Sequence, residues 1–156
     1  MIIKFVNNKE GIAEKLAANL GMSDRAEFAA TGNTDRVEDV IQYGLDNTQC
    51  YILEDNEGKM LCLGGVDPAN GTLWLLTTTH AEGLNRKGRL TAAFKLRGVL
   101  NEILTKHRGV KFQNVVSMSN KSHIRLIKAL GGKGFNTLLT NNKTSQMFYP
   151  FYFIKE

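Results

Sequence analysis

Hydrophobic positions in the middle of the chain fall into three short runs, residues 49–54, 60–66 and 72–78. The runs are separated by segments 55–59 and 67–71, which contain Gly, Asn, Asp and Pro. Apolar runs of this length, joined by short turn-forming segments, are typical of consecutive antiparallel strands. The sequence therefore predicts a three-stranded meander.

Helical periodicity lies on both sides of this meander. Residues 12–20 and 37–45 carry apolar side chains at intervals of three or four and predict two helices, the second capped by Thr34. Residues 22–28 between them are expected to form a loop or a short helix. A longer helix that ends near residue 108 is predicted from an apolar stripe of Leu90, Phe94, Leu96, Val99, Leu100, Ile103 and Leu104.

Further strands are predicted toward the two ends of the chain. Residues 2–6 and 112–118 have the apolar, β-branched character of strands, and a short helix is expected to begin at Asn120. Segments 135–140 and 146–154 predict a final pair of strands. The last of these is rich in aromatic side chains, namely Phe148, Tyr149, Phe151, Tyr152 and Phe153.

The resulting order of elements is β-α-α-β-β-β-α-β-α-β-β. A helix joins the strands at 72–78 and 112–118, so this pair must be parallel if the two strands are neighbours. We therefore predict an α/β fold with a mixed central sheet and helices on both faces. Residues 1–156 are expected to form a single domain.

The composition is that of an ordinary globular protein. The chain has 156 residues, of which 42% are hydrophobic and 22% charged, and this length suits one compact domain with a buried core. No apolar run approaches the roughly 20 residues that cross a bilayer. Residues 1–6 show no basic leader followed by a long apolar core. We therefore expect a cytoplasmic protein without a membrane segment.

The two cysteines, Cys50 and Cys62, lie on facing strands of the predicted meander. A disulfide between them is geometrically possible, but free buried thiols are expected in a cytosolic protein. Neither cysteine lies near a group of histidines, so the sequence predicts no metal site.

The formal net charge of +5 comes mainly from the second half of the chain. A basic band there consists of Arg86, Lys87, Arg89, Lys95, Arg97, Lys106, Arg108 and Lys111. This band can face the phosphates of a cofactor, a nucleic acid or an acidic partner, and the alternative is a solvated helix face. No paired zinc ligands and no aromatic-rich base-stacking strand accompany it, so nucleic-acid binding is not expected.

The most specific pattern is the stretch 119–131, which reads Ser-Asn-Lys-Ser-His-Ile-Arg-Leu-Ile-Lys-Ala-Leu-Gly. It follows a predicted strand, its Asn120 can cap a short amphipathic helix, and Gly131 can end that helix. A polar group at such a junction can hold a small phosphorylated or acylated ligand. His123 can act as an acid or base or contact a partner, but we expect a half-buried hydrogen-bonding residue.

The order of the predicted elements resembles that of the GNAT superfamily, the N-acetyltransferase fold that binds acetyl-coenzyme A. Asn120, Ile124, Leu126 and Gly131 look like the second motif of that superfamily. The run 120–131 as a whole is similar to a more specific group, the small internal virion proteins of T7-like short-tailed phages.

Two further features agree with the phage family, namely Trp74 in the run 74–78 and the aromatic-rich final hairpin. Both are expected to serve packing, with Trp74 against the core or a sheet face and the last strand as a cover of the core. Aromatic side chains exposed on that strand would instead mark a protein–protein surface.

The resemblance to the GNAT superfamily implies an acetyl-CoA site at the end of the central strand and the start of the following helix. Its residues in this sequence would be Thr77, Thr78, Arg86, Lys87, Gly88, Arg89 and Asn120. The superfamily's turn carries paired glycines whose N–H groups face the pyrophosphate. Here only Gly88 of the pair is present, and the neighbouring arginines can pair with phosphate oxygens directly.

In many members of the superfamily a tyrosine seven residues after the motif's Asn protonates the departing thiolate. The corresponding position is Ile127, whose aliphatic side chain cannot donate a proton. The catalytic residues therefore stay unassigned, although Thr77, Thr78, His80 and Glu82 lie at or just beyond the end of the central strand.

Two functions follow from these patterns. The first is a phage GNAT-fold protein of morphogenesis or host interaction, with a phage structural or host protein as its partner and without acetyl transfer. It would lie in the host cytoplasm or on the virion during assembly. The alternative is an acetyl-CoA-dependent N-acetyltransferase, in which an amine attacks the thioester carbonyl between splayed strands around Thr77 and Ser117. The single glycine and Ile127 favour the first.

Overall fold

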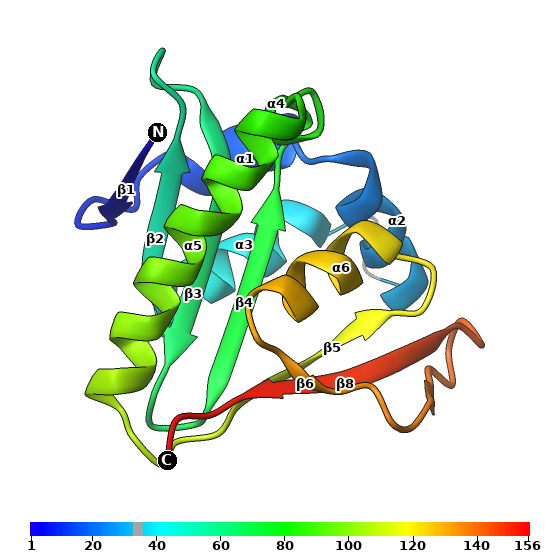
Figure 1. Cartoon of the computed structure of the whole chain (residues 1–156). Helices are drawn as coiled ribbons and strands as arrows, with labels where there is room; N and C mark the ends of the chain where they lie inside the picture. Colours follow the sequence, from blue (N-terminus) through cyan, green and yellow to red (C-terminus); the bar gives the residue numbers. More distant parts are fainter. Residues whose placement is uncertain (33–35) are drawn as a thin grey trace.

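The computed structural model describes residues 1–32 and 36–156. Within these residues eight strands form one sheet, namely β1 (Ile2–Phe5), β2 (Gln49–Glu54), β3 (Met60–Asp67), β4 (Thr72–Thr77), β5 (Phe112–Ser117), β6 (Lys133–Gly134), β7 (Leu139–Thr140) and β8 (Met147–Phe153). The helices are α1 (Ile12–Ala18), α2 (Met22–Thr31), α3 (Val37–Asn47), α4 (Thr79–Glu82), α5 (Arg86–Lys106) and α6 (Lys121–Ala129). The strand order is β1-β2-β3-β4-β5-β8-β6, and β7 pairs with β8 (Figure 1).

The predicted meander is confirmed, because β2, β3 and β4 pair antiparallel in sequence. Aspartates fix both of its turns. Asp55 Oδ1 accepts hydrogen bonds of 2.9 Å from the backbone N–H groups of Glu57 and Lys59. Asp67 Oδ1 accepts one of 3.0 Å from the N–H of Ala69. Such side-chain to backbone bonds are the reason that Asp is common in turns.

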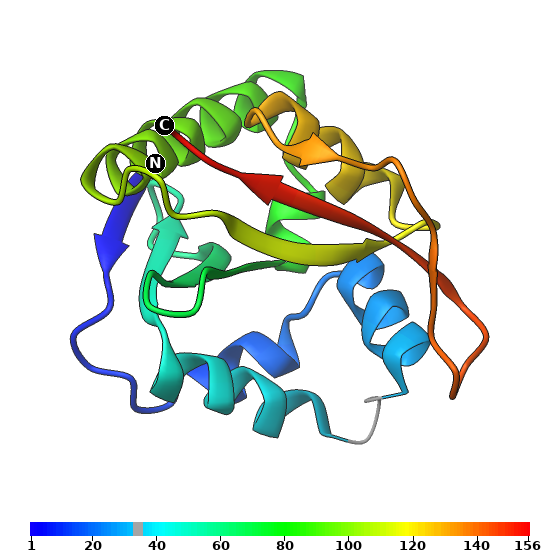
Figure 2. The ribbon, with the colours of Figure 1, turned by 90° about the horizontal axis from the view of Figure 1, so that it is seen from below.

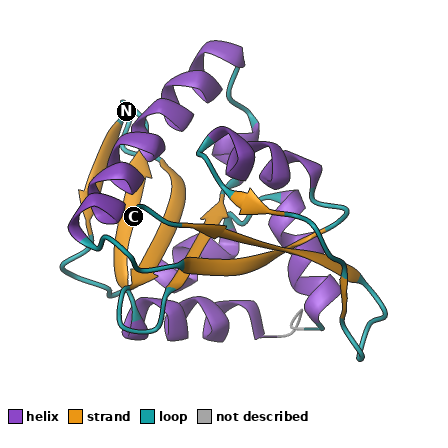
Figure 3. Ribbon diagram, turned by 60° about the horizontal axis from the view of Figure 1, so that its bottom comes forward, coloured by secondary structure: helices purple, strands orange, loops and turns teal. Residues whose placement is uncertain are grey.

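The parallel pair is confirmed as well, but β4 and β5 are joined only at their beginnings. Their ladder consists of one residue pair, Thr72 opposite Gln113. Beyond it the strands diverge, and Figure 3 shows the opening between them. We call this opening the wedge and define it by residues 73–77 of β4 and 114–117 of β5.

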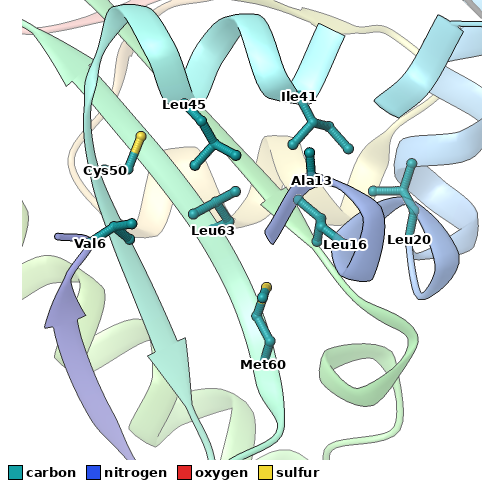
Figure 4. Packing of buried hydrophobic residues seen from close by; sticks show 9 residues of the cluster. All are labelled: Val6, Ala13, Leu16, Leu20, Ile41, Leu45, Cys50, Met60 and Leu63. Carbon is teal, nitrogen blue, oxygen red and sulfur yellow. The ribbon is translucent and has the colours of Figure 1, made fainter. Parts of the chain in front are cut away.

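Helices cover both faces of the sheet, as predicted. Figure 2 shows α5 and α6 on one side and α1, α2 and α3 on the other. The hydrophobic core under α1 and α3 contains Val6, Ala13, Leu16, Leu20, Ile41, Leu45, Cys50, Met60 and Leu63 (Figure 4). Separate buried clusters lie under α5 and α6.

The packing role predicted for Trp74 is confirmed. Its ring packs against the core under α1 and α3, and its Nε1 donates a hydrogen bond of 3.0 Å to Thr48 Oγ1. Two glycines make room for the ring. A Cβ atom on Gly65 would lie 2.5 Å from Trp74 Nε1, and one on Gly44 would lie 2.9 Å from Trp74 Cζ2.

The aromatic final strand also covers the core, as predicted. Phe148, Phe151 and Phe153 of β8 are 6%, 7% and 3% exposed. The ring of Phe151 contacts that of Phe153 edge to face at 6.1 Å between ring centroids. Both cysteines, Cys50 and Cys62, are free and buried, as expected. Among the helices described, none is long and apolar enough to cross a membrane.

Of the two structures expected for residues 22–28, a loop or a short helix, the helix is found, since these residues are part of the ten-residue helix α2. The strand predicted at 135–140 is wrong over most of its length, because only Leu139–Thr140 is a strand. Gly134 and Phe135 have φ angles of 106° and 64°, which turn the chain, and only Lys133–Gly134 pairs with β8 before them. The expected cap Thr34 lies outside the described residues.

The apolar stripe predicted for the long helix is wrong at its N-terminal end. Leu90 and Phe94 are 63% and 78% exposed, whereas Leu100 and Ile103 are buried. With 3.6 residues per turn, Leu90 and Phe94 lie on the face of α5 opposite to the one that carries Leu96, Leu100 and Ile103. Two large apolar side chains therefore point to solvent.

Candidate functional site

The first polar contact in the wedge is made by Asp24 of α2. Its Oδ2 accepts hydrogen bonds from the backbone N–H of Thr77, at 2.7 Å, and from the hydroxyl of Thr77, at 2.9 Å. This N–H belongs to β4 and faces the side where β5 has diverged. The Asp24 side chain is 1% exposed, so it bonds to β4 in a setting almost without water.

The second contact is made by Glu27, one helical turn further along α2. One carboxylate oxygen accepts a short hydrogen bond from the backbone N–H of Ser117 in β5. The other oxygen lies 3.4 Å from the side-chain amide nitrogen of Asn120. Asp24 and Glu27 thus place one carboxylate on each strand of the wedge. Their spacing of three residues puts both on the same face of α2.

The third group, His123, comes from α6. Its Nε2 lies 3.5 Å from Asp24 Oδ1 and 3.4 Å from Thr77 Oγ1. Asn120 caps this helix, as the sequence predicted, because its Oδ1 accepts from the backbone N–H of His123 at 3.4 Å. His123 is 8% exposed, so it is more buried than the half-buried residue that we expected.

Burial dominates the electrostatics of the two carboxyl groups. Removal from water raises the pKa of Asp24, and His123 and the hydrogen bonds from Thr77 oppose this shift. Burial also raises the pKa of Glu27, against the opposing hydrogen bond from Ser117. The Oδ1 atom of Asp24 is buried and accepts no hydrogen bond from any residue that the structure describes. The cluster is therefore short of donors.

A cavity of about 310 Å³ adjoins the cluster. Its lining is mainly apolar and includes Leu75, Leu100, Val116, Leu126, Ile127 and Phe151. Asp24, Glu27 and His123 belong to the same lining. Ile127, the position at which the GNAT resemblance implies a proton donor, thus reaches this space with an aliphatic side chain.

The residues predicted to bind a cofactor fall into separate places. Thr77 and Asn120 lie at the wedge, in contact with Asp24 and Glu27. Thr78 is buried, donates to the carbonyl of Met60 at 2.7 Å and caps α4. The others, Arg86, Lys87, Gly88 and Arg89, form the first turn of α5.

That first turn offers few free groups for a phosphate. Asn85 caps α5 and accepts from the backbone N–H of Gly88 at 2.8 Å. Arg89 donates from Nη2 to the carbonyl of Glu82 at 3.2 Å. The short helix α4 lies between β4 and α5, which the sequence prediction did not include. Arg86 and Lys87 are exposed.

Sequence reasoning missed Asp24 and Glu27 entirely. They lie in the segment 22–28 that was expected to be a loop or short helix. Two acids three residues apart, between Gly21 and Phe28, were the available signal. That spacing predicts that both acids lie on one helix face, but it does not reveal that this face contacts β4 and β5.

These contacts decide how well the wedge suits an acyl thioester. The carbonyl oxygen of a thioester needs N–H donors at the position where negative charge develops. The N–H groups of Thr77 and Ser117 already donate to Asp24 and Glu27. The two carboxylates also bring negative charge to this place. With α2 in this position, the residues of the wedge do not fit the thioester of acetyl-CoA.

Solved structures with a similar fold are acetyltransferases. Spermidine N-acetyltransferase from Vibrio cholerae, in complex with CoA and spermine, matches with a TM-score of 0.67 and 12% identity over 98% of this chain and 95% of that chain. Aminoglycoside 6'-acetyltransferase type Ii matches with a TM-score of 0.64 and 14% identity over 99% and 97%. A GNAT family acetyltransferase from Bacillus cereus ATCC 10987 matches with a TM-score of 0.58 and 13% identity over 100% and 99%. At these identities the likeness shows a GNAT fold.

Sequence comparison gives a more specific relationship. No curated protein matches the chain. A sequence-family model described as "Bacteriophage T7, probable scaffold protein Gp13" matches residues 50–138, which is more than half of the chain. The matched region runs from β2 to the residues just before β7 and includes the stretch 119–131 that carried the resemblance to T7-like phages. The chain therefore belongs to the family of the bacteriophage T7 probable scaffold protein Gp13.

Proposed function

We propose that the protein acts in phage assembly as a binding protein on a GNAT fold and does not transfer acetyl groups. The family's description as a probable scaffold protein supports a role in assembly. We place the protein in the host cytoplasm and, while particles form, on the assembling particle. Its partner would be a phage structural protein or a host protein.

The observation that carries this proposal is the occupation of the wedge by α2. Asp24 and Glu27 hold the N–H groups of Thr77 and Ser117, one on each strand. An acyl-transfer site stabilises a developing oxyanion with such donors. Carboxylates in the same place repel that negative charge. The arrangement therefore favours a wedge that is filled by α2 over an acyl-transfer site. Ile127 removes the expected proton donor as well.

A surface for the partner lies on α5. We define the α5 outer face by Arg86, Lys87, Leu90, Phe94 and Arg97. Leu90 lies three or four residues after the first two, and Phe94 and Arg97 follow it at spacings of four and three, so all five share one side of the helix. Leu90 and Phe94 are 63% and 78% exposed. Apolar side chains between basic ones suit a partner with an acidic rim around an apolar centre.

Acetyl-CoA binding tests the loss of the reaction. We expect no rise in Tm of the purified protein at millimolar acetyl-CoA, because the wedge donors are occupied. The measurement is a thermal melt with and without the cofactor, beside a melt with CoA alone. A rise in Tm together with acetylation of an added polyamine would overturn this part of the proposal.

Recovery of the protein from phage particles and assembly intermediates tests the binding role. We expect wild-type protein in these fractions and a large loss with Phe94→Glu, which puts charge at the centre of the α5 outer face. Tyr43→Glu is the matched control, because Tyr43 is 71% exposed on α3, on the other side of the sheet. Equal recovery of Phe94→Glu and wild-type protein would contradict the proposed surface.

A second candidate function is N-acetyl transfer from acetyl-CoA to an amine. The cavity of about 310 Å³ beside the wedge, with His123 in its lining, favours it. This function would need α2 to release the N–H groups of Thr77 and Ser117. It predicts a rise in Tm with acetyl-CoA that disappears in the double variant Arg86→Ala, Arg89→Ala. If the rise in Tm persists in that variant, acetyl-CoA binds elsewhere than at the first turn of α5.

A further inference from the structure

The wedge cluster contains the elements of a metal site that the sequence did not predict. Asp24 and Glu27 of α2 and His123 of α6 offer one ligand atom each, and these atoms all lie within 4.8 Å of one another. Asp24 Oδ1 and His123 Nε2 are 3.5 Å apart. Two ligands bound tetrahedrally to one zinc ion at about 2.0–2.1 Å are separated by roughly 3.4 Å, so the spacing already suits a shared ion.

An independent observation points to a missing ligand. Asp24 Oδ1 accepts no hydrogen bond from the described residues, and the side chain is only 1% exposed. Its contact with His123 Nε2, at 3.5 Å, is an ion pair only if the imidazole is protonated. A buried carboxylate oxygen without a hydrogen-bond donor is costly, and native structures rarely keep one. The atom lies on the His123 side of the carboxylate, where a cation bound by His123 would satisfy it.

The charges around the cluster support a cation. In the described part of the chain, no lysine or arginine forms an ion pair with Asp24 or Glu27. Arg25, their neighbour on α2, donates to the carbonyls of Leu20 and Ala17 instead. Glu82 adds further negative charge near Asp24. A divalent ion bound beside His123 would balance the charge of the two carboxylates.

The remaining contacts orient the ligands as outer-shell partners do in metal sites. Thr77 holds Asp24 Oδ2 and leaves Oδ1 for the ion. Ser117 and Asn120 hold Glu27 from the strand and from the cap of α6. One imidazole and two carboxylates suit Zn²⁺ and similar transition-metal ions better than Ca²⁺ or Mg²⁺.

We propose that Asp24, Glu27 and His123 bind one divalent transition-metal ion of the Zn²⁺ class. The ion ties α2 to α6 across the wedge, and it leaves one coordination position for water or for the hydroxyl of Thr77. Its role is to hold α2 in the wedge, and this role does not depend on whether the protein binds acetyl-CoA.

Metal titration of the chelator-stripped, full-length protein tests this site. We expect one Co²⁺ per chain, detected by the ligand-field absorption of the bound ion, and displacement by Zn²⁺. At a free Zn²⁺ concentration about 100 times Kd, the Tm should rise by about 5–10 °C. A protein that binds neither ion stoichiometrically would overturn the proposal.

Variants connect the ion to its ligands. His123→Gln is expected to weaken Co²⁺ binding at least tenfold, since even outer-shell changes cost about 10–100-fold. His80→Gln, at an exposed histidine of α4, is the matched control and should bind like the wild type. Circular dichroism shows whether His123→Gln folds. If it does not, Asp24→Asn tests the same site, because its side chain keeps an oxygen that can accept from the N–H of Thr77. Unchanged binding in Asp24→Asn, or equal losses in His80→Gln and His123→Gln, would contradict the site.

Discussion

At the scale of single residues, two side chains of α2 decide what the wedge can do. Asp24 and Glu27 satisfy one backbone N–H on each diverging strand, at Thr77 and Ser117. A GNAT fold with other residues at these two positions would present both donors to a ligand. The chemistry of the site thus depends on a pair of acids outside the stretch that identifies the family.

Glu27→Ala should lower the free energy of unfolding by about 1–3 kcal/mol, because it leaves the N–H of Ser117 without its acceptor. Urea denaturation in the presence of a chelator measures this effect without any contribution from bound metal. Glu14→Ala, at an exposed acid of α1, is the control and should change stability by less than about 0.5 kcal/mol. Equal effects of the two variants would show that the Glu27 contact is not stabilising.

The cysteines allow a prediction on pH. Burial raises the pKa of Cys62 to about 12 and also raises the pKa of Cys50. Since the thiolate is the reactive form, both thiols of the folded protein should resist iodoacetamide at pH 8. Mass spectrometry should find both alkylated only in concentrated guanidinium chloride. Alkylation of either thiol in the native protein would contradict the buried, protonated state.

At the scale of elements, the meander is the part that the sequence predicts best. Asp55 and Asp67 fix its turns by local hydrogen bonds, which do not depend on the rest of the fold. The strand predicted at 135–140 failed because a positive φ at Phe135 overrides the strand propensity of its neighbours. The position of α2 against β4 and β5 was beyond prediction, since it depends on contacts between residues 53 and 90 positions apart.

Gly65→Ala tests how tightly β3 packs against Trp74. The added Cβ would lie 2.2 Å from Thr48 Oγ1 and 2.5 Å from Trp74 Nε1, so we expect a loss of about 1–3 kcal/mol. Gly98→Ala is the matched control in α5. A Cβ atom there meets nothing within 4 Å, and helix propensity should stabilise the protein by about 0.5–1 kcal/mol. Chemical denaturation of both variants should therefore show effects of opposite sign.

At the scale of the whole molecule, a GNAT fold is combined with a basic surface on α5 and a wedge that α2 fills. The net charge is +5, and basic residues surround the exposed Leu90 and Phe94 on α5. The sequence predicted this band but not its apolar centre, because the helical stripe was assigned to the core. Charge and exposed apolar area together suggest association with an acidic surface.

Association through the α5 outer face should weaken as salt rises, because exposed charges are screened beyond a short distance. Sedimentation of assembly intermediates at low and high salt, followed by quantification of the bound protein, measures this dependence. Phe94→Ala should reduce binding at both salt concentrations, whereas Arg97→Ala should reduce it mainly at low salt. Binding that is insensitive to salt would show that the basic residues are only a solvated face.

The wedge itself is held open by Asn114. Its side-chain amide donates to the carbonyl of Leu73 at 2.7 Å, and its Oδ1 accepts from the N–H of Val115 at 2.7 Å. One side chain therefore ends the pairing of β4 and β5 after their first residues. It follows that the opening does not depend on the acids that fill it. Substitutions confined to α2 can therefore fill or vacate the wedge while the sheet stays unchanged.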